Sequence, residues 1–401
     1  MLIRERYLSE LREFYDSKLI KILVGMRRCG KSTLLKQAIE EIKCRGINED
    51  HIIYINFENL AFNKLRSKEN LYAELQAKIT DEGRHYFFLD EIQLVEGFAE
   101  VVNSLTAVYD NVSIFITGSN SKLLSSELPT ELSGRYLRID VNPLSYKEFL
   151  QLTKQEDEGR EGKIFFDYAK WGGLPGRCEF RTEDSIRTYL QSVYDSVILR
   201  DIVERLEIRK SYLFDSILQY IISTIGREFS VERLFALLKG MGAKVTKETL
   251  YDFLDALCRA LLVKRVYRYD VSGKSILQSL SRYYVTDLGI GQIKKSNNEF
   301  QNYIALKNVV YNELVNRKYE VYVGKTPKGE VDFIARKNGE TKYLQVAYTL
   351  DDTSTLEREF GAYKCVKDNN PKYVLSLDHT DYSRDGIVHL NIIDFLLGDR
   401  L

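Results

Sequence analysis

The stretch GMRRCGKS at residues 25–32 constrains the fold more than any other part of the sequence. It follows the apolar run LIKILV and precedes KSTLLKQAIEEIK, in which apolar residues recur at helical spacing. The pattern predicts a buried strand, a glycine-rich loop and an amphipathic helix in direct succession. The expected apolar face of the helix consists of Leu34, Leu35, Ala38, Ile39 and Ile42.

A loop of this kind has the chemistry to bind the phosphates of a nucleotide. Gly25 and Gly30 permit backbone conformations that direct amide N–H groups at phosphate oxygens, and the positive end of the helix dipole adds to the attraction. Lys31 is expected to bridge the β- and γ-phosphates, and the Ser32 hydroxyl to ligate Mg²⁺. We expect no constraint on the Cys29 side chain. The predicted nucleotide-binding residues are Gly25, Met26, Arg27, Arg28, Cys29, Gly30, Lys31, Ser32 and Thr33.

A second motif supplies the acidic groups that nucleotide hydrolysis needs. HYFFLDEIQ predicts a buried strand, Tyr86 to Leu89, that ends in the acidic pair Asp90 and Glu91. Asp90 is predicted to hold Mg²⁺ through its water shell, and Glu91 to polarise the attacking water. Adjacent acids at a strand end also occur in solvated turns, so this assignment depends on the phosphate loop upstream.

Further polar candidates lie next to the following strands. SIFITGSN ends in Ser119 and Asn120, neutral polar residues of the kind that sense a γ-phosphate, so Asn120 is a candidate catalytic residue. In ELSGRYLRIDV, Arg135 follows a glycine just before another strand. It is a candidate arginine finger, acting on its own nucleotide or on a neighbour's. Spacing alone equally allows a surface arginine that caps the preceding helix.

Apolar runs of strand length alternate with helical patterns over residues 1–143. These runs are LIKILV, IIYINF, YFFL, SIFIT and YLRIDV. The alternation predicts an α/β fold with a mostly parallel, three-layer sheet, and it places the ligand at the carboxyl ends of the strands, where both motifs fall. Asn56 and Glu58 end the second strand and face the same side as these motifs. They are candidates for positioning substrate or water, but we expect them chiefly to shape the loop.

Composition limits the alternatives. A chain of 401 residues predicts two to four domains. Lys+Arg and Asp+Glu balance at 58 each, which argues against a generally basic protein that coats nucleic acid but leaves a local basic face open. No window approaches ~18 consecutive apolar residues and the N-terminus MLIRERYLSE is charged early, which predicts a cytoplasmic protein without a membrane partner. Five separated cysteines, with only four histidines to assist, argue against a disulfide framework and a zinc site.

The motifs, taken in order, resemble a known family. GMRRCGKST, YINFEN, FFLDEIQ, ITGSNSKLL, LSGRY, PLSYKEFL and WGGLP resemble the AAA-like ATPases of bacteria and archaea that carry an uncharacterised C-terminal domain. The resemblance spans essentially the whole chain. It implies a P-loop NTPase core at residues 1–143 that binds ATP with Mg²⁺, and it leaves a homo-oligomer open. Helical patterns at 144–205 fit a lid over the nucleotide. In related STAND-type ATPases a Gly-x-Pro motif of the lid packs on the adenine, and Gly173-Leu174-Pro175 resembles it, which makes Pro175 a candidate nucleotide contact.

Residues 206–290 have the pattern of a winged helix-turn-helix. SYLFDSILQYIISTIG, SVERLFALLKG and TKETLYDFLDALCRALL predict three helices, with Ser230 and Thr246 as N-caps, and LVKRVYRYD with RYYVTD predicts a ribbon. Cations outnumber acids between residues 244 and 269, a mild bias compatible with DNA contact through Lys247, Tyr251 and the wing. Such a module equally serves protein contacts, so DNA and a protein partner both stay open.

Residues 291–401 resemble the core of restriction-endonuclease-like PD-(D/E)xK nucleases. In those enzymes a helix Glu, a strand Asp and an E-x-K triplet hold Mg²⁺ and position water. Glu313 and Asp332 match the first two positions. The triplet here reads Gln345-Val346-Ala347, a weaker acceptor without the lysine, and this predicts a C-terminal α/β domain that binds but does not cut. Candidates for a displaced lysine are Lys342 and Lys364.

Two functional hypotheses follow from these patterns. The first is an ATP-hydrolysing switch or motor that acts on DNA or a DNA-bound partner. Its predicted catalytic residues are Glu91, Lys31, Arg135 and Asn120, and its metal ligands are Ser32 and Asp90. The second is a slow, ATP-gated scaffold or protein-binding module without nucleic-acid activity. The presence of Glu91 favours the first hypothesis, whereas the balanced charge and the degenerate nuclease triplet favour the second.

Overall fold

The chain forms two compact units, Met1–Asn142 and Pro143–Leu401. The computed structural model describes residues 2–118, 132, 134–155, 162–197, 211–293, 302–327 and 329–398. Two residues predicted to sense the γ-phosphate, Ser119 and Asn120, lie outside these ranges. Within them, no helix combines the length and the apolar character needed to cross a membrane.

The first unit is built on a parallel sheet of five strands in the order β2-β3-β4-β1-β5. The strands are β1 (Ile20–Val24), β2 (Ile52–Asn56), β3 (His85–Asp90), β4 (Val112–Gly118) and β5 (Tyr136–Asp140). Each coincides with an apolar run of the sequence, and β1, β3 and β4 are buried along their whole length. Strands that are buried on both faces need a layer of helices on each side.

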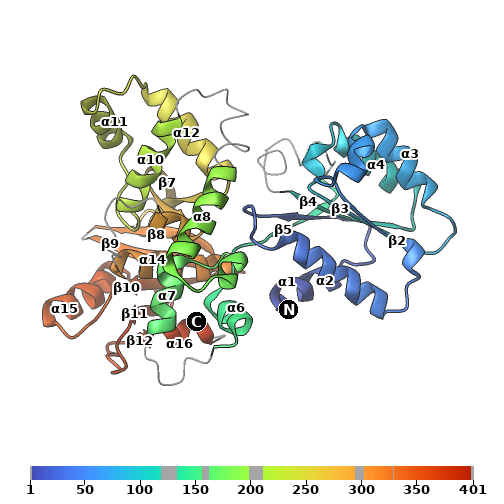
Figure 1. Cartoon of the computed structure of the whole chain (residues 1–401). Helices are drawn as coiled ribbons and strands as arrows, with labels where there is room; N and C mark the ends of the chain where they lie inside the picture. The colour runs from blue at the N-terminus through green and yellow to red at the C-terminus, as the bar shows by residue number, and fades with distance from the viewer. Residues whose placement is uncertain are drawn as a thin grey trace. The chain divides into compact units, whose positions relative to one another are not determined.

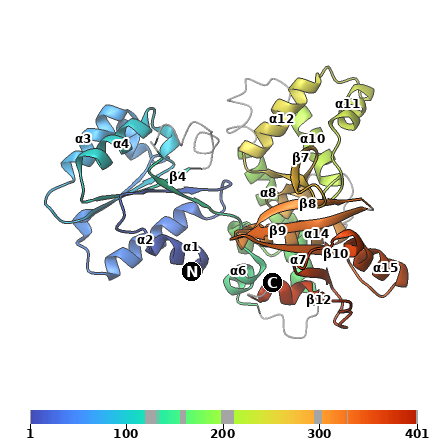
Figure 2. The same cartoon turned by 180° about the vertical axis from the view of Figure 1, so that it is seen from behind.

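Helices cover both faces of this sheet. In Figures 1 and 2, α3 and α4 lie on one face and α1 and α2 on the other. The helices are α1 (Glu5–Arg12), α2 (Lys31–Cys44), α3 (Lys68–Ala77) and α4 (Phe98–Val108), with short 3-10 turns at Glu49–His51, Leu60–Arg66 and Ile92–Leu94. The predicted apolar face of α2 is buried throughout. The prediction of a parallel, three-layer α/β core is therefore confirmed.

The second unit begins with helices. They are α6 (Tyr146–Thr153), α7 (Lys163–Trp171), η5 (Pro175–Glu179), α8 (Glu183–Val197), α10 (Ser211–Ser223), α11 (Val231–Gly240) and α12 (Lys247–Arg259). The two predicted N-caps are confirmed, because the Ser230 side chain accepts a hydrogen bond from the Arg233 amide and the Thr246 side chain accepts one from the Thr249 amide. A hairpin, β6 (Val263–Asp270) and β7 (Ser275–Val285), follows the three helices as the sequence predicts.

The hairpin is also part of the C-terminal sheet. One sheet of seven strands runs in the order β12-β11-β10-β9-β8-β6-β7, with β6 parallel to β8. The sheet therefore crosses the predicted division between residues 290 and 291. The remaining elements are α13 (Leu288–Ile293), α14 (Asn302–Asn316), β8 (Glu320–Thr326), β9 (Gly329–Lys337), β10 (Glu340–Val346), α15 (Thr353–Gly361), η7 (Ala362–Cys365), β11 (Lys372–Ser376), β12 (Ile387–Asn391) and α16 (Ile392–Leu397). Neither β12 nor α16 is expected from the sequence.

The helices that the sequence assigns to a lid pack within the second unit. α13 packs against α7 and α8, α14 against α7, and α16 against α6. In both views α10 to α12 gather at the β7 end of the sheet, and α15 and α16 lie toward β12. The predicted lid, winged helix and nuclease-like core thus share one packed body.

Candidate functional site

The phosphate loop joins β1 to α2, and its two glycines are required by the local geometry. A Cβ atom on Gly25 would lie 2.2 Å from the Val141 carbonyl oxygen, so no side chain fits there. Gly30 has φ 105°, a left-handed conformation that favours glycine, and it directly precedes α2. No side chain caps this helix and its first turn carries no acidic residue, which leaves its amide N–H groups and positive dipole end for an anion.

Lys31 folds back over the loop. Its Nζ donates to the Gly25 carbonyl oxygen at 3.0 Å and to the Met26 carbonyl oxygen at 3.2 Å, and the side chain is buried. The ammonium group is thus held inside the curve of the loop that phosphates would occupy.

The expectation that the Cys29 side chain is unconstrained is wrong. The residue is fully buried, and its Sγ donates to the Val141 carbonyl oxygen at 3.2 Å. Arg4 directly precedes α1 and is buried. Its guanidinium donates to the Cys29 carbonyl oxygen at 3.1 Å and to the Asn142 carbonyl oxygen at 3.0 Å. The loop is fixed because its inner side packs on the chain that leaves β5.

Asp90 is fully buried at the end of β3 and is surrounded by hydrogen-bond donors. Ser32 Oγ donates to Oδ1 at 3.1 Å, and the Thr117 hydroxyl donates to the same oxygen. Tyr54 OH donates to Oδ2 at 2.8 Å, with Asn56 Nδ2 at 3.3 Å. Burial and the Asp90 charge raise the pKa of Tyr54, so its hydroxyl keeps its proton and remains a donor. The predicted metal ligands Ser32 and Asp90 are brought together.

The order of the strands explains this arrangement. β3 lies between β2 and β4, and Asn56 pairs with Asp90 in the register of the sheet. Tyr54 and Thr117 were not predicted as site residues. Tyr54 and Asn56 are two residues apart at the end of one strand and therefore face the same side, which is the signal that could have identified them together.

Glu91 lies in a sharp turn after β3. Its φ of 57° is unusual for a residue with a side chain and is typical of positions held for function. The Glu91 amide donates to Thr117 Oγ1 at 3.0 Å, and its carboxylate accepts from Gln93 Nε2. Thr117 therefore contacts both Asp90 and the Glu91 backbone and fixes one acid relative to the other.

Arg135 lies at the amino-terminal ends of the strands, whereas the phosphate loop lies at their carboxyl-terminal ends. It directly precedes β5, whose first residue, Tyr136, pairs with Ile20 at the start of β1. Gly25 lies beyond the other end of β1. The two positions are six residues apart along the strand direction, roughly 20 Å at ~3.3 Å per residue. An arginine side chain cannot span this distance, so Arg135 cannot reach the phosphate loop of its own chain.

The WGGLP motif is fastened inside the second unit. A Cβ atom on Gly172 would lie 2.2 Å from Asp287 Oδ1, and one on Gly173 would lie 2.2 Å from the Leu144 carbonyl oxygen. The buried Asp287 carboxylate accepts from the Gly173 amide at 2.7 Å and from the Gly289 amide at 2.9 Å. Burial raises the pKa of Asp287 to about 6. The motif thus joins α7 to α13.

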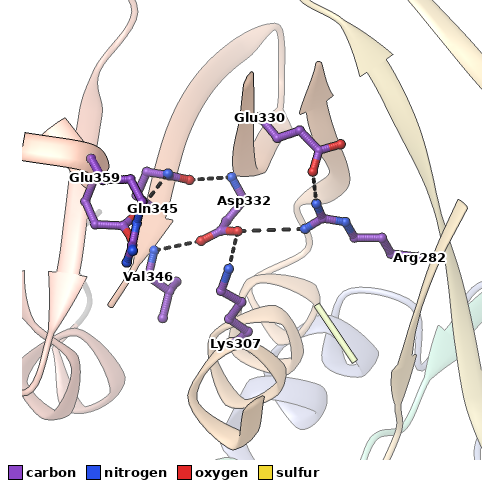
Figure 3. A network of polar contacts seen from close by, with 8 residues as sticks. Arg282, Lys307, Glu330, Asp332, Gln345, Val346 and Glu359 are labelled. Atoms are coloured by element: carbon purple, nitrogen blue, oxygen red, sulfur yellow. Dashed lines mark hydrogen bonds and ion pairs between the residues drawn. The ribbon is translucent and has the colours of Figure 1, made fainter. Parts of the chain in front are cut away.

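The nuclease-like position in the second unit is occupied by a network of charged side chains. Figure 3 shows Asp332 at its centre. Asp332 pairs with Lys307 Nζ, lies 3.7 Å from Arg282 Nη1, and accepts from the Val346 amide at 3.1 Å. Arg282 also pairs with Glu330. The Asp332 charge is therefore neutralised by cations of α14 and β7.

The other nuclease-like positions have structural contacts as well. Gln345 accepts from the Asp332 amide and donates through Nε2 to Glu359 at 3.0 Å (Figure 3). Glu313 pairs with Arg317 at 2.8 Å. No three His, Cys, Asp or Glu side chains in the described part of this unit lie close enough to share a metal ion. Lys342 donates to Tyr319 OH at 3.1 Å and Lys364 is exposed, so the lysine that meets Asp332 is Lys307, which the sequence did not suggest.

Known proteins are similar to this chain over its whole length. Residues 17–150 match the model of an AAA domain, and residues 162–299 match a domain of unknown function. The chain is 34% identical over 402 residues to an uncharacterized protein from Haemophilus influenzae, covering 99% of both chains. It is 32% identical over 399 residues to one from Methanocaldococcus jannaschii, covering 94% of this chain and 85% of the relative. This chain belongs to the family of these two relatives and carries an AAA domain.

The fold of the AAA protein is also found in a solved structure. A Walker-type ATPase of Pyrococcus abyssi superposes with a TM-score of 0.50 at 19% identity, covering 73% of this chain and 96% of that one. At this identity the likeness concerns the fold alone. Together with the AAA domain match, it confirms the predicted P-loop NTPase core.

Proposed function

We propose that the AAA protein binds ATP with Mg²⁺, hydrolyses it, and uses the cycle as a switch or motor on DNA or a DNA-bound partner. One observation carries the proposal: the buried Asp90 carboxylate is bonded to Ser32 of the phosphate loop and is followed directly by Glu91. A purely structural carboxylate does not require a phosphate loop as its neighbour.

The residues fit a magnesium nucleotide. Ser32 Oγ and Asp90 Oδ1 are 3.1 Å apart. Adjacent oxygens around an octahedral Mg²⁺ are about 3 Å apart, since each bond is 2.0–2.1 Å long. Ser32 and Asp90 would hold the ion directly or through water, and Lys31 with the loop amides would hold the phosphates. The bound ion neutralises charge on the phosphate oxygens.

Each remaining residue of the site has a separate task. Glu91 accepts a proton from the attacking water and orients it. Gln93 and Thr117 hold the Glu91 side chain and backbone, and Tyr54 keeps Asp90 in place. The donors to Asp90 are neutral, so they bring no positive charge that would compete with a metal ion.

Arg135 acts on a neighbouring subunit's nucleotide. Arg135 lies at the amino-terminal ends of its own strands, too far from the phosphate loop of the same chain. This position supports a finger that acts in trans. This role requires a homo-oligomer with head-to-tail contacts. Arg135 then supplies the finger for the site of the neighbouring chain.

The second unit serves as the element that reads the partner. Lys247 and Tyr251 are exposed on α12, which supports contact with DNA. Three exposed carboxylates share this helix, Glu248, Asp252 and Asp255, and they favour a second candidate function, an ATP-gated scaffold for a protein partner. The Pro175 contact with adenine and the C-terminal domain that binds without cutting belong to the same proposal.

Phosphate release with and without duplex DNA tests the proposal. Full-length protein should release phosphate from ATP in Mg²⁺, and DNA should change the rate in a manner that Lys247→Ala weakens. Arg259→Ala, another exposed cation of α12, is the matched control. Hydrolysis unaffected by DNA, together with a protein partner whose binding depends on ATP, would favour the scaffold instead.

A further inference from the structure

Two histidines and an aspartate lie close together at the amino-terminal ends of β2 and β3 in the first unit. Among the described residues, His51, Asp81 and His85 are a group whose possible ligand atoms all lie within 4.8 Å of one another. The chain has only four histidines. Two of the four lie at this position, whereas the phosphate loop lies at the carboxyl-terminal ends of the strands.

The register of the sheet brings the group together. Ile52 at the start of β2 pairs with Tyr86 of β3, so the residues just before them, His51 and His85, are neighbours. Their rings stack with centroids 4.2 Å apart. The loop between α3 and β3 adds Asp81, whose Oδ2 lies 3.1 Å from His51 Nε2. Residues distant in sequence thus form one compact donor set.

We propose that His51, Asp81 and His85 form a binding site for a borderline transition-metal ion such as Zn²⁺. Two imidazoles and one carboxylate are a donor set that suits Zn²⁺ and its neighbours in the first transition row. The sequence argues against a zinc site because its cysteines are separated and its histidines few, but the fold brings two of the four histidines together without a cysteine. Exposure of the Asp81 side chain leaves room for water as a further ligand.

The surroundings prepare the donors for an ion. His85 Nδ1 lies 2.8 Å from the Gly83 carbonyl oxygen, a contact that holds the proton on Nδ1 and makes Nε2, which accepts from the Thr80 amide at 3.3 Å, the nitrogen with a lone pair. Burial lowers the pKa of His85 and so favours the neutral ring. The Gly83 amide donates to Asp81 Oδ1 at 2.7 Å, which fixes the carboxylate and lowers its pKa. Gly83 therefore supports two of the three ligands.

The distances also set the expected strength of binding. Ligands of a tetrahedral ion with bonds of about 2.1 Å are about 3.4 Å apart. The contact between His51 and Asp81 at 3.1 Å is close to this spacing. The His85 ring stacks on His51, so it must turn toward the ion and exchange a 3.3 Å hydrogen bond from the Thr80 amide for the metal. We expect moderate affinity, weaker than that of a closed structural zinc site.

Titration of the full-length protein with Co²⁺, followed by displacement with Zn²⁺, tests the site. Measurements are made without nucleotide and in excess Mg²⁺, so that the Ser32 and Asp90 oxygens are not counted. We expect one Co²⁺ per chain with visible d–d absorption and no thiolate charge-transfer band, which excludes the cysteines. His51→Gln should weaken binding more than tenfold, since loss of a mere supporting partner already costs 10–100-fold.

Two controls separate this site from general surface binding. His379→Gln, at a histidine outside the group, should leave the affinity unchanged. Asp81→Asn should weaken it as His51→Gln does, and both variants should keep the wild-type ATPase rate without added transition metal. Equal affinity in wild type and His51→Gln, or no saturable binding, would overturn the proposal.

Discussion

Arg135→Ala should nearly abolish ATP hydrolysis, and the activity should return when this variant is mixed with Glu91→Gln protein. The register of β5 with β1 places Arg135 about 20 Å from the start of its own phosphate loop. As an arginine finger, Arg135 would therefore act on the nucleotide of another subunit. Arginine fingers contribute about 10³–10⁵ in rate.

The expected recovery of ATP hydrolysis equals the fraction of subunit interfaces that are active in the mixture. An active interface needs an intact Arg135 from one subunit and an intact Glu91 from the next. In an equal, random mixture about one quarter of head-to-tail interfaces satisfy both conditions. Phosphate release from the mixture should therefore reach about a quarter of the wild-type rate, although each variant alone is inactive.

A neighbouring arginine provides the matched control. Arg138 is exposed on β5 and pairs with Asp140 at 2.7 Å. Arg138→Ala should keep its activity. Mixed assemblies that form, as shown by co-purification of two differently tagged variants, but release no phosphate would refute the finger in trans. Full activity of Arg135→Ala would refute any role for this residue.

Three further predictions concern buried charges. Burial lowers the pKa of Lys21 to about 7, below its unfolded value of about 10.5, so the free energy of unfolding should rise with pH between these two values. Lys21→Met should remove this slope in denaturant titrations, and an unchanged slope would contradict the assignment. Asp332→Ala should cost about 3–5 kcal/mol in denaturant titrations, because it removes the carboxylate that pairs with Lys307 and Arg282. Plasmid in Mg²⁺ or Mn²⁺ should stay intact, and cleavage that vanishes in Asp332→Ala would contradict a non-cutting domain. Asp287→Asn should lower the free energy of unfolding by about 1–3 kcal/mol, because the new NH₂ group cannot accept and one backbone amide, such as that of Gly173, loses its acceptor. An unchanged midpoint of thermal unfolding would contradict this.

The sequence predicts the nucleotide-binding unit well because its signals are local. The strand, glycine loop and helix around Gly25 occupy consecutive residues, and the acids at Asp90 end an apolar run. The donors to Asp90 come from other strands, so Tyr54 and Thr117 become visible only when the strand order is known. The constraint on Cys29 depends on Val141, more than a hundred residues away along the chain.

The second unit was less predictable because its pattern of strands does not fix their partners. The sequence indicates a hairpin and a separate C-terminal domain, but it gives no sign that β6 pairs with β8. Nor does it suggest Lys307, which lies on a helix among apolar residues and meets Asp332 only through the packing of α14 on the sheet. The nuclease-like pattern places its lysine at residue 347, which is an alanine in this chain.

Comparison of ATP binding with ATP hydrolysis in two variants tests the central claim most directly. Titration with ATP in Mg²⁺ should show no binding to Lys31→Ala, because the phosphates lose their cation, and wild-type affinity for Glu91→Gln. Phosphate release should be absent from both variants, since Glu91 is needed only when water attacks. Equal ATP affinity in wild type and Lys31→Ala would contradict the assignment of the phosphate loop, and wild-type hydrolysis by Glu91→Gln would contradict the catalytic role of the acid.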